Sequence, residues 1–213
     1  MLDNTVTKDF LKVFDLFLQK IKNGENFAFT RFSDGELFIL KNETVVLAPS
    51  YFVTGDRVGP NIYTEEEQKE FIPKKHQFYR EKLMEAFVHN QENYYKGICP
   101  IVDVGKEGFE YQLNILGDER QDHLTYASAL INRNYRRFIE EMVPLFKDRE
   151  IIYIVNNLAD LSGLPFEVKK DFRIGKNCMV NDYGVVEQVR QYIEENNIKD
   201  HIVLCSAASL SNF

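Results

Sequence analysis

The sequence predicts an α/β fold: a single-domain, Rossmann-like, open and mostly parallel sheet flanked by helices. Two observations predict this class. Short apolar runs with the composition of buried strands, of which residues 151–155 and 202–205 are the clearest, alternate with longer segments of helical periodicity. No internal repeat or low-complexity linker divides the 213 residues, so we expect one domain over residues 1–213.

Helices are predicted where apolar residues recur at intervals of three and four, and strands where short apolar runs are bounded by turn residues. Asn23 and Gly24 end the first helix, and Asp182 is the expected N-cap of the last one. The first predicted helix is capped by Asn4 or Thr7, and a short helical turn is expected from Asp34 through Leu40. The later predicted helices cover residues 64–89, 105–116, 125–146 and 184–197. The predicted strands cover residues 27–30, 44–47, 97–99, 150–155, 172–174 and 202–205.

Residues 48–63 show no regular periodicity but are rich in aromatic residues, glycine and proline. Long irregular segments in compact domains are either functional or disordered, and aromatic side chains argue against disorder. We therefore expect this segment to be a mobile lid over a substrate.

Composition excludes several classes of function. A net charge of −7 and a pI near 5.2 disfavour binding to nucleic acid. The three cysteines lie far apart, so neither a disulfide framework nor a zinc cluster is indicated. Neither a leader sequence nor an apolar run of membrane-spanning length is evident, which favours a cytoplasmic location and leaves peripheral membrane association open.

The most distinctive stretch is residues 27–37, an apolar run that breaks into Arg31, Ser33, Asp34, Gly35 and Glu36. In an extended segment, residues two apart point to the same side, so two carboxylates converge. Hard divalent cations prefer such oxygen ligands, and an arginine can bind a phosphate. The alternative is a solvated Asp-Gly turn with the arginine as ion-pair partner.

Polar residues at later strand ends are candidate nucleotide contacts, because ligands of open α/β sheets bind at the carboxyl ends of the strands. Small residues at 206–209 would admit phosphate oxygens close to backbone N–H groups, and an aromatic ring at residue 183 either stacks on a base or packs at a helix start. The candidate ligand-binding residues are Thr30, Ser33, Asn156, Asn157, Asp182, Tyr183, Ser206 and Ser209.

The run Arg-Phe-Ser-Asp-Gly-Glu at 31–36 resembles the signature of bacterial GT-D-fold glycosyltransferases, in which it carries an Asp-x-Glu metal motif. The order of later segments is also similar, and the resemblance covers residues from about 7 to 209. These segments are Gly-Ile-Cys-Pro at 97–100, Tyr-Ala-Ser-Ala-Leu-Ile-Asn-Arg-Asn-Tyr from 126, Asn-Cys-Met-Val-Asn-Asp-Tyr at 177–183, and Ser-Ala-Ala-Ser at 206–209.

Members of that family continue past the Ser-rich turn into a further helix and strand, whereas this sequence ends at Phe213. We therefore expect the sequence to be a piece of a longer polypeptide, truncated at its C-terminal end. Whether it works within a multi-domain chain or as a homodimer stays open.

The resemblance implies a metal-dependent glycosyltransferase that moves a sugar from a nucleotide diphosphate sugar, expected to be UDP-linked, to a hydroxyl of a cell-surface glycan or glycoprotein. It implies that Asp34 and Glu36 bind Mn²⁺ or Mg²⁺ and that Arg31 adds positive charge. Two alternatives stay open: a metal-dependent phosphohydrolase of nucleotide or sugar phosphates, and a non-catalytic module that binds a sugar nucleotide or glycan.

Overall fold

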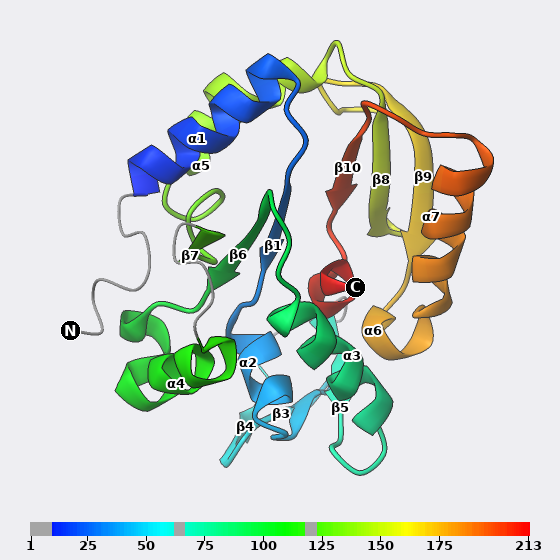
Figure 1. The fold of residues 1–213 in the computed structure, drawn as a ribbon. Coiled ribbons are helices and arrows are strands. Elements are labelled where there is room, and N and C mark those ends of the chain that lie inside the picture. The colour runs from blue at the N-terminus through cyan, green and yellow to red at the C-terminus, as the bar shows by residue number, and fades with distance from the viewer. Residues whose placement is uncertain (1–9, 62–66, 118–122) are drawn as a thin grey trace.

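The computed structural model describes residues 10–61, 67–117 and 123–213, whose strands form three sheets (Figure 1). Two sheets are parallel with three strands each, and the third is antiparallel with four strands. Helices flank the parallel sheets, which confirms the α/β class and is compatible with a Rossmann-like fold. The expected open sheet is divided in two, because β1 and β10 share no ladder in the described residues.

The first parallel sheet has the order β1-β6-β7 and contains the start of the signature stretch, residues 27–37. Its strands are β1 (Ala28–Arg31), β6 (Tyr94–Ile98) and β7 (Leu124–Tyr126). Gly97 is needed in β6, because a Cβ atom there would lie 2.9 Å from the Cα atom of Ala127. This close approach brings the chain that follows β7 against the carboxyl end of the sheet.

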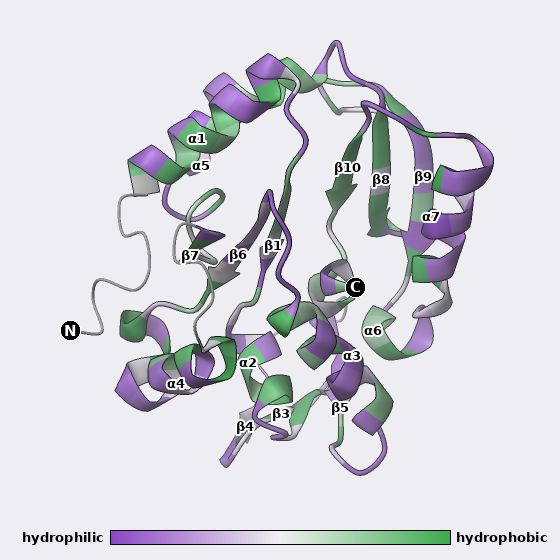
Figure 2. Cartoon of the chain, in the orientation of Figure 1, coloured by the Kyte–Doolittle hydropathy of each residue, from purple (hydrophilic) through white to green (hydrophobic). Residues whose placement is uncertain are grey.

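The second parallel sheet has the order β10-β8-β9. Its strands are β8 (Ile151–Asn156), β9 (Val168–Ile174) and β10 (Ile202–Cys205). Ile151 and Ile152 are fully buried, and Figure 2 shows β8 and β10 as hydrophobic strands. Such continuous apolar runs are typical of parallel strands covered on both faces, which is why the sequence predicted these strands. In β10, however, Val203 and Cys205 are exposed.

The antiparallel sheet corrects two predictions. Its order is β4-β3-β2-β5, with β2 (Val45–Leu47), β3 (Tyr51–Thr54), β4 (Arg57–Pro60) and β5 (Lys69–Phe71). Much of the expected lid is therefore a paired hairpin, in which Gly55 turns the chain at φ +58°. β5 lies where the sequence predicted helix, and residues 62–66 lie outside the described residues.

The main helices are α1 (Phe10–Asn23), α2 (Asp34–Leu40), α3 (Gln77–Val88), α4 (Ile101–Leu116) and α7 (Gly184–Glu195). The expected caps of the first helix, Asn4 and Thr7, lie outside the described residues. In Figure 1, α2, α3, α4 and α6 (Cys178–Asn181) gather where the parallel strands end. A short 3₁₀ helix, η6 (Ala208–Asn212), follows β10 into the same region. The carboxyl ends of both parallel sheets therefore face one shared region.

The single helix predicted over residues 125–146 is wrong. Its first residues belong to β7, and residues 127–134 form turns. The remainder forms α5 (Tyr135–Arg137), a π-helical turn η4 (Phe138–Met142) and a 3₁₀ turn η5 (Val143–Phe146). Pairing with β6 overrides the local helical periodicity at residues 124–126. Pro144, near the start of η5, cannot donate a backbone hydrogen bond to continue the preceding turn.

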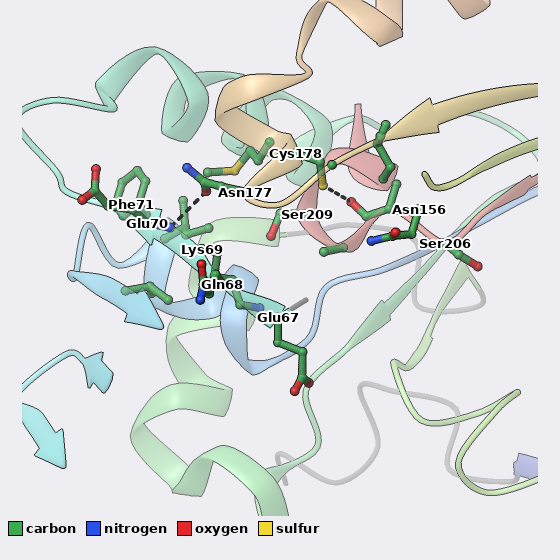
Figure 3. A pocket seen from close by; sticks show the side chains of 17 residues that line it. Glu67, Gln68, Lys69, Glu70, Phe71, Asn156, Asn177, Cys178, Ser206 and Ser209 are labelled. Carbon is green, nitrogen blue, oxygen red and sulfur yellow. Dashed lines mark hydrogen bonds between the residues drawn. The ribbon is translucent and has the colours of Figure 1, made fainter. Parts of the chain in front are cut away.

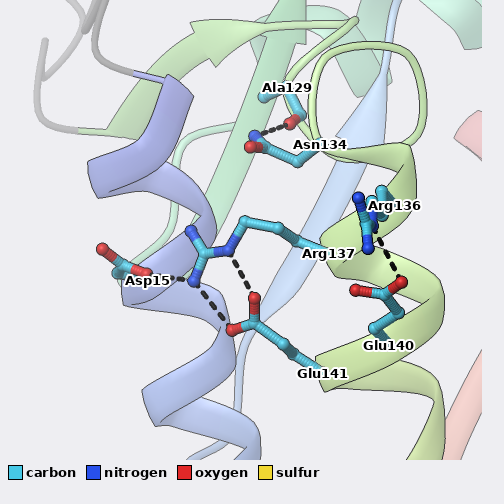
Figure 4. Close-up of polar contacts among 7 residues, drawn as sticks. All are labelled: Asp15, Ala129, Asn134, Arg136, Arg137, Glu140 and Glu141. Atoms are coloured by element: carbon cyan, nitrogen blue, oxygen red, sulfur yellow. Dashed lines mark hydrogen bonds and ion pairs between the residues drawn. The ribbon is translucent and has the colours of Figure 1, made fainter.

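Arg137 joins α1 to η4 (Figure 4). Its guanidinium donates to Asp15 at 2.8 Å and to both oxygens of Glu141, and it lies 4.3 Å from the ring centroid of Phe14. These carboxylates raise the pKa of Arg137 above its ordinary value. Unlike a local helix pair, this contact connects segments 122 residues apart.

Replacement of Arg137 by alanine should lower the free energy of unfolding by about 1 to 2 kcal/mol, because it removes a cation–π contact and an ion-pair network. Urea denaturation would measure the loss. Arg136→Ala is the matched control, since Arg136 is 86% exposed and pairs only with Glu140 one turn away among the described residues. Equal losses in the two variants would contradict the interpretation.

Candidate active site

The signature stretch leaves β1 at Arg31 and enters α2 through Ser33, the N-cap residue. The short helical turn predicted from Asp34 is confirmed as α2, and the expectation that Asp34 and Glu36 share one side of an extended segment is therefore wrong. Residues two apart on an α-helix point about 200° away from each other. Asp34 is accordingly exposed, whereas Glu36 is buried with 7% of its surface accessible.

Glu36 uses both carboxylate oxygens inside the protein. Its Oε2 atom accepts a hydrogen bond of 2.8 Å from the backbone N–H of Ser33, as the third residue of a capped helix often does. Its Oε1 atom accepts a hydrogen bond from the hydroxyl of Ser209 in η6. The first and last motifs of the sequence therefore meet at this carboxylate.

Arg31 binds neutral oxygens. Its Nε atom donates to the carbonyl of Ala127 at 2.6 Å, and its terminal nitrogen lies 3.5 Å from the Oδ1 atom of Asn132. In the described residues no ion pair joins Arg31 to Asp34. The geometry therefore does not support the alternative in which Arg31 is the ion-pair partner of a solvated Asp-Gly turn. The guanidinium instead ties β1 to the loop after β7.

A third carboxylate, Asp103, lies in the first turn of α4 and was not predicted from the sequence. Burial, together with the negative charges of Asp34, Glu36 and Asp103, raises the pKa of the Cys99 thiol well above its usual value. Cys99 follows β6, and the three carboxylates belong to the first turns of α2 and α4, the helices that follow β1 and β6. The only available signal was the position of Asp103 just after the Cys-Pro strand end.

A cavity of about 280 Å³ lies at the carboxyl end of the second parallel sheet (Figure 3). Three predicted residues line it, namely Asn156 at the end of β8 and Ser206 and Ser209 after β10. Lys69, Asn177 and Cys178 also line it but were not predicted. The remaining lining residues are Ile39, Val45, Glu67, Gln68, Glu70, Phe71, Ile174, Gly175, Met179, Ala207 and Ala208.

Asn177 and Cys178 hold the wall of this cavity together. The backbone N–H of Asn177 donates to the carbonyl of Gln68 at 3.1 Å, and its Oδ1 atom accepts from the N–H of Glu70 at 3.0 Å. Asn177 has φ +53°, a left-handed conformation that asparagine tolerates better than most residues. The Cys178 thiol donates to the carbonyl of Ala207 at 3.1 Å.

Three of the predicted residues lie near strand ends but do not line the cavity. Thr30 lies within β1, opposite Lys96, and Ser33 caps α2. Asn157 is exposed, although its N–H pairs with the carbonyl of Ile174. These three residues therefore belong to the strands and turns around the cavity and do not line it.

Asp182 and Tyr183 serve packing and local structure. The expectation that Asp182 caps the last helix is wrong, because Tyr183 is the N-cap residue of α7 and the Asp182 carboxylate accepts from the N–H of Gly175 at 2.8 Å. The ring of Tyr183 meets the rings of Phe78 and Phe213 edge-on, at centroid distances of 5.1 and 5.2 Å. The sequence left two roles open for this ring, stacking on a base or packing at the helix start, and the contacts in the structure are those of packing.

The described residues contain no group of three His, Cys, Asp or Glu side chains that could hold a metal ion by itself. Asp34 still fits a cation that arrives with a substrate, because magnesium often binds one or two carboxylates together with phosphate oxygens. No hydrogen bond or ion pair occupies Asp34 within the described part of the chain. Glu36 does not fit in this arrangement, since both of its oxygens accept hydrogen bonds.

No protein-family model, curated protein or solved structure matches this chain. Among the described residues, no helix combines the length and apolar character needed to cross a membrane.

Replacement of Ser209 by alanine should lower the free energy of unfolding by about 1 to 3 kcal/mol, because it leaves a buried carboxylate oxygen of Glu36 without its donor. Ser211→Ala, in the same 3₁₀ turn, is the control, since the Ser211 hydroxyl bonds only within its own turn among the described residues. Urea denaturation compares the two. Equal stability of both variants would show that the Glu36 contact contributes little.

Proposed function

We propose that the chain is a metal-dependent glycosyltransferase that takes its sugar from a nucleotide diphosphate sugar, expected to be UDP-linked. The observation that supports this most is the hydrogen bond between Glu36 and Ser209. It joins the two outer motifs on which the family resemblance rests, at the edge of the fold where α/β proteins bind nucleotides. The acceptor would be a hydroxyl of a glycan or glycoprotein.

In this proposal the cavity beside Ser206 and Ser209 receives the donor. Its lining combines apolar side chains with a few hydroxyl, amide and charged groups, a composition typical of small-molecule sites. Asp34 would hold Mn²⁺ or Mg²⁺ against the diphosphate, while Glu36 orients the turn that carries Asp34. The bound ion would supply electrostatic stabilisation of the leaving nucleotide.

Arg31 would add positive charge near the same region. Its two contacts with neutral oxygens fix the guanidinium without neutralising it. A fixed cation stabilises developing negative charge better than a mobile one, because little reorganisation is needed during the reaction.

Two observations would redirect the proposal. Release of inorganic phosphate from a nucleotide or a sugar phosphate, with water as the acceptor, would favour a phosphohydrolase. Binding of the nucleotide sugar that is equal in EDTA and in Mn²⁺, with no turnover, would favour a non-catalytic binding module.

Asp34→Asn should abolish the Mn²⁺-dependent part of donor binding and UDP release, because the amide is a weaker cation ligand. A UDP-sugar at 100 times its Kd should stabilise the unaltered protein by about 2.7 kcal/mol, which a thermal shift assay detects. Glu187→Gln is the control, an exposed carboxylate in the first turn of α7. Full Mn²⁺ dependence in Asp34→Asn would exclude Asp34 as a ligand.

A further inference from the structure

Lys69 is the only residue with a cationic side chain among the described residues that line the cavity. It lies in β5 of the antiparallel sheet, opposite Leu47 of β2, and is half-buried. Within the described part of the chain, no hydrogen bond or ion pair occupies its ammonium group. An ammonium group at a cavity that lacks a protein partner is available to a ligand anion.

The ammonium also lies close to the signature stretch. Its Nζ atom is 3.8 Å from the position that a Cβ atom would take on Gly35, the residue between the two carboxylates of α2. Lys69 therefore extends from the antiparallel sheet toward the first turn of α2. This places one cation between the cavity and the exposed Asp34.

The acidic residues of the cavity are directed elsewhere. The carboxylate of Glu70 pairs with Lys75 at 2.8 Å, which also lowers the pKa of Glu70. In Figure 3, the carboxylate of Glu67 points away from Ser209. Ser206, which also lines the cavity, shares a hydrogen bond of 2.9 Å with the Tyr153 hydroxyl and carries no charge.

We infer that Lys69 binds a phosphate group of the ligand that occupies this cavity, and that it does so without a metal ion. The antiparallel sheet then contributes a binding residue to a site otherwise built from parallel strand ends. Lysine suits this role, since its compact charge pairs with phosphate oxygens from many directions. The inference depends on the proposed function only for the choice of UDP as a probe.

Isothermal titration in EDTA would test this inference, with UDP, inorganic pyrophosphate and uridine as probes. Lys69→Gln should weaken binding of UDP and pyrophosphate about tenfold or more, because one charged hydrogen bond is lost. Binding of uridine should not change. Lys69→Arg keeps the charge and should retain most of the affinity, and Lys74→Gln removes an exposed lysine outside the cavity lining as the control.

Three results would overturn the inference: unaltered UDP and pyrophosphate binding in Lys69→Gln, an equal loss for uridine, or no binding of either phosphate probe by the unaltered protein. A thermal melt of each variant separates lost binding from lost folding. Sugar transfer is assayed separately, so phosphate binding that depends on Lys69 supports the inference even if transfer is absent. If Lys69→Gln keeps both its phosphate binding and its metal-dependent sugar transfer, the inference about Lys69 fails while the proposed function is supported.

Discussion

The buried carboxylate of Glu36 is the contact on which the candidate site depends. An ionised carboxylate is costly to bury unless hydrogen bonds replace its hydration, and here one donor is local while the other comes from a residue 173 positions later. Asn212 adds a second link by donating to the carbonyl of Arg31 at 3.2 Å. The geometry of the signature stretch therefore depends on the turn after β10, although the two are far apart in sequence.

Helix formation gives the two carboxylates of the Asp-Gly-Glu triplet different environments. Burial and hydrogen bonding suit Glu36 to a structural role, whereas exposure leaves Asp34 open to a cation or substrate. Burial of both would add like-charge repulsion to the cost of desolvation. One buried and one exposed carboxylate avoid that cost, and the buried one fixes the turn that carries the other.

The sequence predicted the features that local pattern determines, including the apolar strands β8 and β10, the periodic helices α1 and α7, and strand-end residues such as Asn156. It failed where pairing partners decide the structure. Residues 124–126 have helical periodicity but pair with β6, and residues 51–60 form a hairpin around Gly55. Lys69 was not predicted because β5 reaches the site only through tertiary contacts.

The cavity is lined both by β5 of the antiparallel sheet and by the ends of the strands of the second parallel sheet. The sequence alone did not predict that these two parts of the fold meet. Its volume, about 280 Å³, lies at the lower limit of the range usual for ligand sites, about 300 to 1,000 Å³. Under the proposed function, such a volume encloses only part of a nucleotide sugar. The phosphates would then extend from Lys69 toward Asp34, at the carboxyl end of the first parallel sheet. The donor would thus lie mainly at the carboxyl end of the second parallel sheet, and the cation bound by Asp34 at the carboxyl end of the first.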